Sequence, residues 1–236
     1  MEAHARVVAE ADGSGGTRLA VLRSAPPLVL RQTGEEATVH LVGGAAGPLG
    51  GDRLRLTVEV GPAATLRWRT VAATIALPGP GPSRIEVTAT VAAGGRLEWL
   101  PEPLIAAARC HHLTMSTVDL DEGAYLVWRD ELVCGRHGES PGDARLSIRV
   151  RLAARPLYQH ELAIGPRAPG WSGPAVLGAA RATGSLLLVN PTWSAGPPDK
   201  HADAAPRAAH VSDVGPPAGQ VGEDFLETLV NGVGTG

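Results

Sequence analysis

The sequence is poor in aromatic residues, cysteine and lysine. Its 236 residues include one Phe, two Tyr and five Trp, so the core of a chain that is 44% hydrophobic must consist mostly of Val, Leu, Ile and Ala. Two cysteines, Cys110 and Cys134, are too few for a disulfide framework. Lys200 is the single lysine among 21 basic residues.

Strong charge and long apolar runs are also missing. The formal net charge is −3, which gives no electrostatic reason to expect binding to nucleic acid or to an anionic membrane. No run of 18 apolar residues is present, so a transmembrane helix is not expected. The first residues, MEAHAR, lack the basic and apolar blocks of a signal peptide. These features together predict a cytoplasmic protein.

What the chain does contain is a repeat centred on three tryptophans, Trp68, Trp99 and Trp128. Each is preceded by leucine at −2, a pair of small residues at −5 and −4, an aliphatic residue at −8 and threonine at −11. The spacing of about 30 residues and the strand–turn–strand pattern predict an all-β fold. We expect a distorted β-helix-like stack of β-hairpin units, with one or two short helices.

Further alternating segments extend this scaffold over residues 1–190. Hairpin strands are expected at 5–9 and 17–23, and later strands at 144–152, 157–164 and 183–190. Residues 191–219 are rich in Pro, Ala and Gly and are interpreted as a flexible linker.

A short helix with its tail is expected in residues 220–236, because 223–230 combine an acidic start with an apolar stripe and a following glycine. This helix could dock on a partner or fold back on its own core.

The search for catalytic chemistry gives weak candidates. In Cys110-His-His112, only Cys110 and His112 share one face of a strand, so a metal site would need further ligands from elsewhere. A strand end with one exposed histidine is the favoured interpretation. The glycine-rich segment 43–51 lacks the Gly-Lys-Ser/Thr of a phosphate-binding loop and leads into a strand. Catalytic residues are therefore not assigned.

The motifs in their order resemble those of the urease accessory protein family UreD, also called UreH. The similarity spans about residues 17–190 and is carried by GPLGGDRLRLTVEVGP (47–62), TVAAT (70–74), GRLEWLPEP (95–103), WRDELV (128–133), GRHGE (135–139) and RPL (155–157).

The resemblance implies a non-enzymatic maturation chaperone. In that family the protein binds UreF, which recruits the GTPase UreG, and the assembly docks on apo-urease and supports GTP-dependent nickel insertion. A dimer within the accessory complex is one arrangement that the resemblance allows. Nickel is then a transient cargo that passes through an internal tunnel, and no tightly bound cofactor is expected.

Family motif positions supply the candidates for the partner surface or the nickel path, with the two threonines ranked second: Gly50, Gly51, Asp52, Arg53, Thr70, Thr74, Glu98 and Glu131. Carboxylates suit weak, reversible holding of a divalent cation. Two other functions remain open, a general β-solenoid interaction module and a metal-dependent hydrolase that uses Cys110 and His112.

Overall fold

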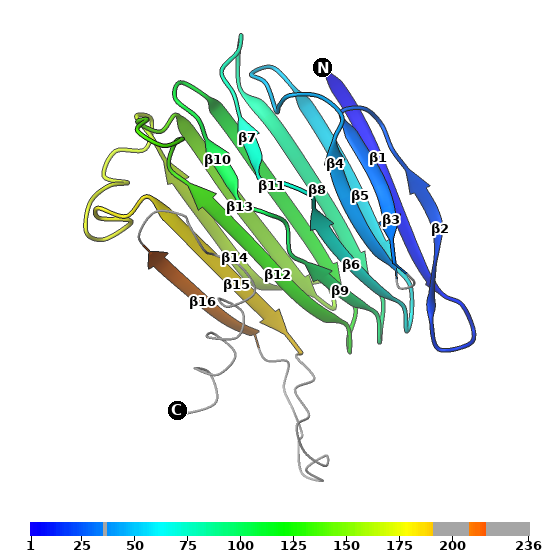
Figure 1. Ribbon diagram of the computed structural model, residues 1–236. Coiled ribbons are helices and arrows are strands. Elements are labelled where there is room, and N and C mark those ends of the chain that lie inside the picture. Colours follow the sequence, from blue (N-terminus) through cyan, green and yellow to red (C-terminus); the bar gives the residue numbers. More distant parts are fainter. Residues whose placement is uncertain (35–36, 191–207, 216–236) are drawn as a thin grey trace.

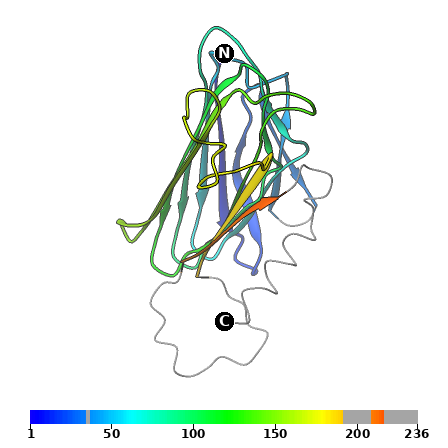
Figure 2. The same cartoon turned by 90° about the vertical axis from the view of Figure 1, so that its left-hand side faces the viewer.

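The chain folds as two facing β-sheets (Figures 1 and 2). The computed structural model describes residues 1–34, 37–190 and 208–215, and every regular element in this part is a strand. Sheet A contains, in spatial order, β14 (Arg155–Ile164), β13 (Asp143–Leu152), β11 (His111–Leu120), β8 (Ser83–Val91), β5 (Arg53–Val60), β1 (Glu2–Ala11) and β2 (Thr17–Arg23). The predicted stacked all-β fold is confirmed.

Sheet B faces sheet A and also carries a short side branch. Its order is β16 (Ala208–Gly215), β15 (Ala182–Val189), β12 (Tyr125–Val133), β9 (Arg96–Trp99), β6 (Thr65–Thr70), β4 (Thr38–Gly43) and β3 (Leu28–Thr33). The short strands β10 (Leu104–Ala106) and β7 (Thr74–Ala76) extend from β12 in parallel.

Each repeat contributes one strand to each sheet. The threonines Thr57, Thr88 and Thr117 lie side by side on the parallel strands β5, β8 and β11. The leucines at −2 align in the same way on β6, β9 and β12. The two strands of a unit therefore pair with their equivalents in neighbouring units and not with each other. This arrangement lets the inner faces of both strands enclose a shared core.

Hairpins occur instead at the ends of the stack. β1 pairs antiparallel with β2, as the sequence predicts, and β13 pairs antiparallel with β14. β3 and β4 form a third antiparallel pair.

The turn between the two strands of a unit repeats a single backbone conformation. Ala63, Gly94 and Gly123, each five residues before a repeat tryptophan, have positive φ angles of 55°, 70° and 79°. Glycine adopts this left-handed conformation without the steric cost that a Cβ atom imposes. The small residues at −5 thus allow the chain to turn from sheet A into sheet B.

The three tryptophans form a continuous stack in the core. The ring centroids of Trp68 and Trp99 are 4.7 Å apart with an interplanar angle of 7°, and those of Trp99 and Trp128 are 4.7 Å apart at 8°. This separation equals the distance between neighbouring strands, so the ladder follows directly from the in-register pairing. Offset stacking adds to the burial of the three rings.

The two ends of the stack differ in their connections. Tight turns join the sheets at one end, whereas the other end carries longer connections, among them residues 44–52, 71–82 (which include β7) and 134–142 (Figure 1). Long loops on a rigid scaffold are the usual location of binding residues. Most of the predicted site residues lie at this end.

The C-terminal predictions fall mainly outside the described residues. The helix expected at 223–230 lies there, as does most of the predicted linker 191–219. Within the linker range, the backbone of Ala208–Gly215 forms β16 and pairs antiparallel with β15. No helix in the described residues is long and apolar enough to cross a membrane.

Candidate functional site

A cavity of about 100 Å³ lies between the two sheets and is named here the central cavity. Apolar side chains from both sheets, including Trp68 and Trp99, form much of its wall. Its polar lining consists of Thr70, Thr74, Glu102, Thr114, Ser116, Asp130 and Glu131. Three of the predicted site residues, Thr70, Thr74 and Glu131, are therefore brought together around one internal space.

The central cavity adjoins a larger pocket on each side. A pocket of about 360 Å³ beneath the loop 43–48 shares Thr70, Thr74 and Ile85 with it. A pocket of about 260 Å³ between β12, β13, β14 and β15 shares Asp130 and Leu146 with it. The shared lining residues show that each of the two pockets neighbours the central cavity.

Asp130 stands at the junction of the central cavity and the second pocket. Its carboxylate accepts a hydrogen bond of 2.9 Å from the indole Nε1 of Trp128. Burial raises the pKa of Asp130 to about 6, and the hydrogen bond from Trp128 lowers it only in part. Period-two alternation from the inward-facing Trp128 was the signal that could have identified Asp130.

Glu131 is also among the residues around the central cavity and is only 7% exposed, but strand alternation places its side chain on the face of Arg129, opposite to that of Trp128 and Asp130. Its Oε2 lies 3.5 Å from Nε of Arg129, yet neither carboxylate oxygen accepts a hydrogen bond from a described residue. The guanidinium of Arg129 donates instead to the main-chain oxygen of Pro101, at 2.7 Å. Burial raises the pKa of Glu131, the charge of Arg129 lowers it, and Glu102 raises it further. A buried carboxylate without hydrogen bonds is costly and suggests a role beyond stability.

Thr70 connects the cavity wall to the loop that carries Glu102. Its hydroxyl donates to the main-chain oxygen of Ala72 at 3.0 Å and accepts from the main-chain nitrogen of Glu102 at 2.9 Å. Thr74 donates its own main-chain N–H to Pro103 at 2.9 Å. Both threonines therefore help to position the loop beside Glu102.

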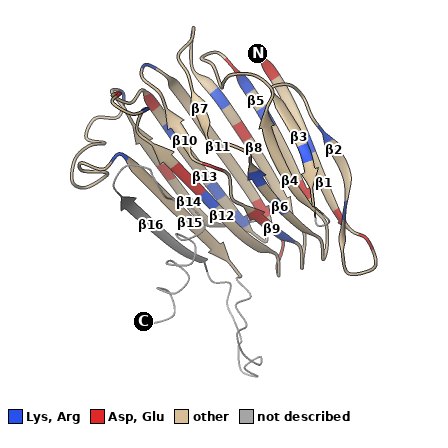
Figure 3. Cartoon of the chain, viewed as in Figure 1, with Lys and Arg blue, Asp and Glu red and all other residues tan. Residues whose placement is uncertain are grey.

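Glu98 lies apart from this cavity, on the outer face of sheet B. Its side chain is 20% exposed and pairs with Arg67 at 3.2 Å and Arg69 at 3.8 Å. Figure 3 shows acidic and basic residues across the middle of this face. Of the two roles predicted for Glu98, this position favours the partner surface over the nickel path.

Gly50 is packed against the backbone of the proline-rich loop. A Cβ atom on Gly50 would lie 2.5 Å from the nitrogen of Gly79, and one on Gly79 would lie 2.5 Å from the oxygen of Gly50. Gly51 has a φ of 94°, which disfavours any side chain. The glycines thus permit two loops to touch at the end of sheet A.

Asp52 is 5% exposed and organises the start of β5. Its carboxylate accepts hydrogen bonds of 2.9 Å from the amino group of Met1 and from the main-chain nitrogen of Leu49. Arg53 is exposed and lies 3.7 Å from Glu2. The segment 50–53 therefore has a clear structural role, and its part in partner binding stays a prediction.

Cys110 and His112 are both buried, and each is used within the fold. The ring nitrogens of His112 lie 2.8 Å from the hydroxyl of Ser83 and 3.0 Å from that of Thr114. Burial lowers the pKa of His112 to about 4 and raises the pKa of the Cys110 thiol to about 11. Among the residues that the structure describes, no group of three or more His, Cys, Asp or Glu side chains could hold a metal ion.

The fold and the cavity define a β-solenoid-like scaffold with an internal polar space. Comparison with known proteins identifies its family. The family described as UreD urease accessory protein matches residues 1–220.

Several proteins named urease accessory protein UreD are similar to this chain over most of their length. The urease accessory protein UreD of Streptomyces avermitilis is 47% identical over 203 residues, which cover 84% of this chain and 81% of that protein. The UreD of Frankia alni is 43% identical, covering 84% and 80%, and that of Frankia casuarinae is 42% identical, covering 89% and 78%. The chain belongs to the UreD family of urease accessory proteins, which implies a role in urease maturation together with its other components.

Proposed function

We propose that this chain is a non-catalytic scaffold which acts with UreF and UreG in GTP-dependent insertion of nickel into apo-urease. We further propose that Ni²⁺ moves between the two sheets, through the central cavity and its two neighbouring pockets. The observation that carries this proposal is the arrangement of the three spaces, which share lining residues in pairs, with Asp130 common to two of them.

The chemistry of the lining suits a passing cation. Carboxylates attract Ni²⁺, and hydroxyl and main-chain oxygens such as those near Thr70 and Ser116 can replace part of its hydration shell. A small set of oxygen ligands binds nickel less tightly than histidine or thiolate ligands would. Transit requires sites that are favourable enough to enter and weak enough to leave.

The state of the two carboxylates supports the same role. Asp130 is partly buried, Glu131 is buried, and both have a raised pKa, so a divalent cation would relieve an existing electrostatic cost. The oxygen atoms of Glu131 accept no hydrogen bond from the described residues, and Arg129 at 3.5 Å is the cation beside them.

Deletion of the gene tests the maturation role. We expect urease from the deletion strain to contain little nickel and to recover it when the full chain is supplied. Fully nickel-loaded urease in the deletion strain would contradict the proposal.

An Asp130→Asn, Glu131→Gln double variant tests the path separately. We expect it to co-purify with UreF at the wild-type level while urease receives less nickel. The control is Glu86→Gln, because Glu86 forms an exposed ion pair with Arg55 on the outer face of sheet A. Equal nickel loading by both variants would remove the two carboxylates from the path.

A further inference from the structure

The side branch of sheet B carries a row of apolar side chains that point away from the core. Ile75, Ile105 and Val133 lie directly opposite one another on the parallel strands β7, β10 and β12. Their neighbours Ala76, Ala106 and Cys134 are buried, so alternation directs the row to the opposite side. Ile75 is 36% exposed, and we name these three residues the apolar row.

The loops around the apolar row are free of charge. Residues 43–51 and 70–83 contain no Asp, Glu, Lys or Arg, and Figure 3 shows the loop beside β7 without a charged residue. Leu49 and Val71, which lie in these loops, are 39% and 57% exposed. Contiguous exposed apolar surface of this kind usually marks an interaction site.

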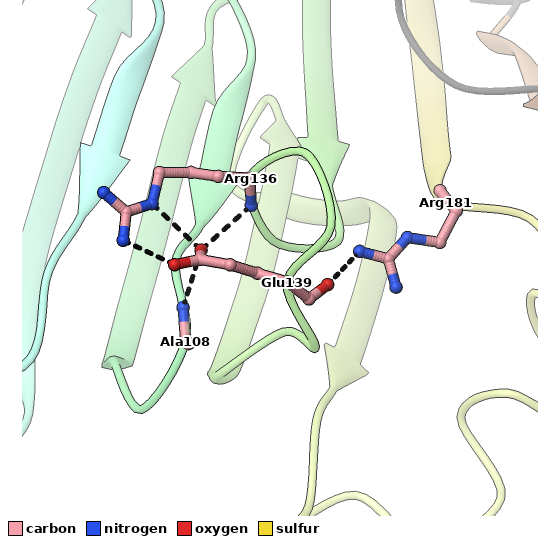
Figure 4. Close-up of polar contacts among 4 residues, drawn as sticks. All are labelled: Ala108, Arg136, Glu139 and Arg181. Atoms are coloured by element: carbon pink, nitrogen blue, oxygen red, sulfur yellow. Dashed lines mark hydrogen bonds and ion pairs between the residues drawn. The ribbon is translucent and has the colours of Figure 1, made fainter.

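A basic pocket adjoins the row at Val133. This pocket has a volume of about 470 Å³ and is lined by Val133, Arg136, His137, Glu139 and Arg181 among others. Glu139 is engaged by Arg136, and by the main-chain nitrogen of Ala108 at 3.3 Å (Figure 4). The hydrogen bond from Arg136 holds the pKa of Glu139 down to about 2, so this carboxylate stays ionised and bound.

The pocket retains positive charge after this pairing. Arg181 donates to the main-chain oxygen of Glu139 and not to its carboxylate (Figure 4). Since Glu139 balances one arginine, two arginines and one carboxylate leave a net charge of +1. The loop geometry fixes Arg136 and Arg181 in place, which lowers the entropic cost of binding an anion.

We infer that the apolar row and the basic pocket form one docking surface for a protein segment whose apolar side chains are followed by a carboxylate. This inference rests on the proposed function, because the segment is supplied by another component of urease maturation. Charge complementarity at the pocket selects an acidic occupant. A second copy of this chain would instead bring two positive pockets together.

The docking surface lies next to one of the pockets of the proposed nickel path. Val71 and Ile75 also line the pocket of about 360 Å³ that neighbours the central cavity. A partner seated on the apolar row therefore lies beside one mouth of the proposed path.

Photo-crosslinking tests the inference on the full chain. We would place p-benzoyl-L-phenylalanine at Ile105, mix the protein with purified UreF, UreG and apo-urease without nickel or GTP, and sequence the crosslinked peptides. The control position is Leu22 on β2, which is 37% exposed and belongs to sheet A. The expected result is a crosslink from Ile105 to an apolar and acidic segment of a partner, with roughly tenfold less product from Leu22.

A negative charge introduced into the basic pocket provides the second arm. His137→Glu is expected to weaken this crosslink about tenfold, whereas His4→Glu, on the outer face of sheet A, leaves it unchanged. Crosslinks only within this chain, only between two copies of it, or equally from Leu22 would overturn the inference. Because nickel and GTP are absent, a partner crosslink can persist even if nickel transfer through the cavity is disproved.

Discussion

The indole Nε1 of Trp128 donates a 2.9 Å hydrogen bond to the Asp130 carboxylate, joining the end of the tryptophan stack to the central cavity. The two residues are separated by one position on β12, so both side chains point toward the core. The repeat that builds the fold thus also positions a candidate cation ligand.

The middle tryptophan should matter most for stability. Trp99 stacks on both Trp68 and Trp128, so Trp99→Ala removes two ring contacts and a large buried volume. We expect a loss of about 3–5 kcal/mol in the free energy of unfolding, measured by urea denaturation. Trp171→Ala serves as the control, since Trp171 is only partly buried at the edge of the core. Equal losses from the two variants would contradict the role of the stack.

The repeated turn predicts a stabilising substitution. Ala63 has a φ of 55° at a position where the next two units use glycine. Ala63→Gly relieves the strain of a left-handed alanine, and we expect up to about 1 kcal/mol of added stability. Gly94→Ala should lose a similar amount. Thermal unfolding of both variants checks the prediction, and a lower melting temperature for Ala63→Gly would refute it.

The contact between the loop that contains Gly50 and the proline-rich loop can be tested by alanine substitution of a glycine in each. Gly50→Ala would place a methyl group 2.5 Å from the nitrogen of Gly79, whereas a Cβ on Gly81 meets nothing within 4 Å. We expect Gly50→Ala to cost about 1–3 kcal/mol of unfolding free energy and Gly81→Ala less than about 0.5 kcal/mol. Similar stability of the two variants, measured by denaturant titration, would show that the loops do not pack as described.

Asp130 should make stability depend on pH. Its folded pKa of about 6 lies above the ordinary value of 3.8, so the folded state holds a proton that the unfolded state releases between these values. This contribution is complete below about pH 4 and is lost as the pH rises through 6. Because Asp130 faces a cavity, we expect Asp130→Asn to gain about 1–3 kcal/mol at pH 7 and little at pH 4.

Urea denaturation of the wild type and of Asp130→Asn across this range measures the difference. Equal effects of the substitution at pH 4 and pH 7 would contradict the raised pKa. A gain in stability at neutral pH would also indicate that Asp130 is kept for function.

The sequence predicted the stack because the repeat offsets carry physical requirements. Trp68, Trp99 and Trp128 align since parallel strands in register bring equivalent residues together. The small residues before them mark the left-handed turn. The sequence could not predict whether the two strands of a unit pair with each other or lie in different sheets. A hairpin and a turn between two sheets give the same alternating pattern.

The candidate site was predicted only in part. Motif positions led to Thr70, Thr74 and Glu131, which line the central cavity, but also to Glu98, which lies on the outer face. Alternation alone separates Glu98 from its inward neighbour Trp99 and places Asp130 inward with Trp128. Burial of Glu131 without hydrogen bonds depends on residues distant in the sequence, and no local pattern reveals it.

Obstruction of the central cavity tests the account most directly. Ser116 is 4% exposed and lines this cavity, so Ser116→Leu narrows it, whereas Thr88→Leu adds the same side chain to the exposed outer face of sheet A. The measurement is the nickel content of urease matured with each variant, for proteins shown by thermal unfolding and UreF co-purification to be folded and assembled. We predict that Ser116→Leu lowers the nickel content while Thr88→Leu leaves it unchanged; full nickel loading with Ser116→Leu would contradict a path between the sheets.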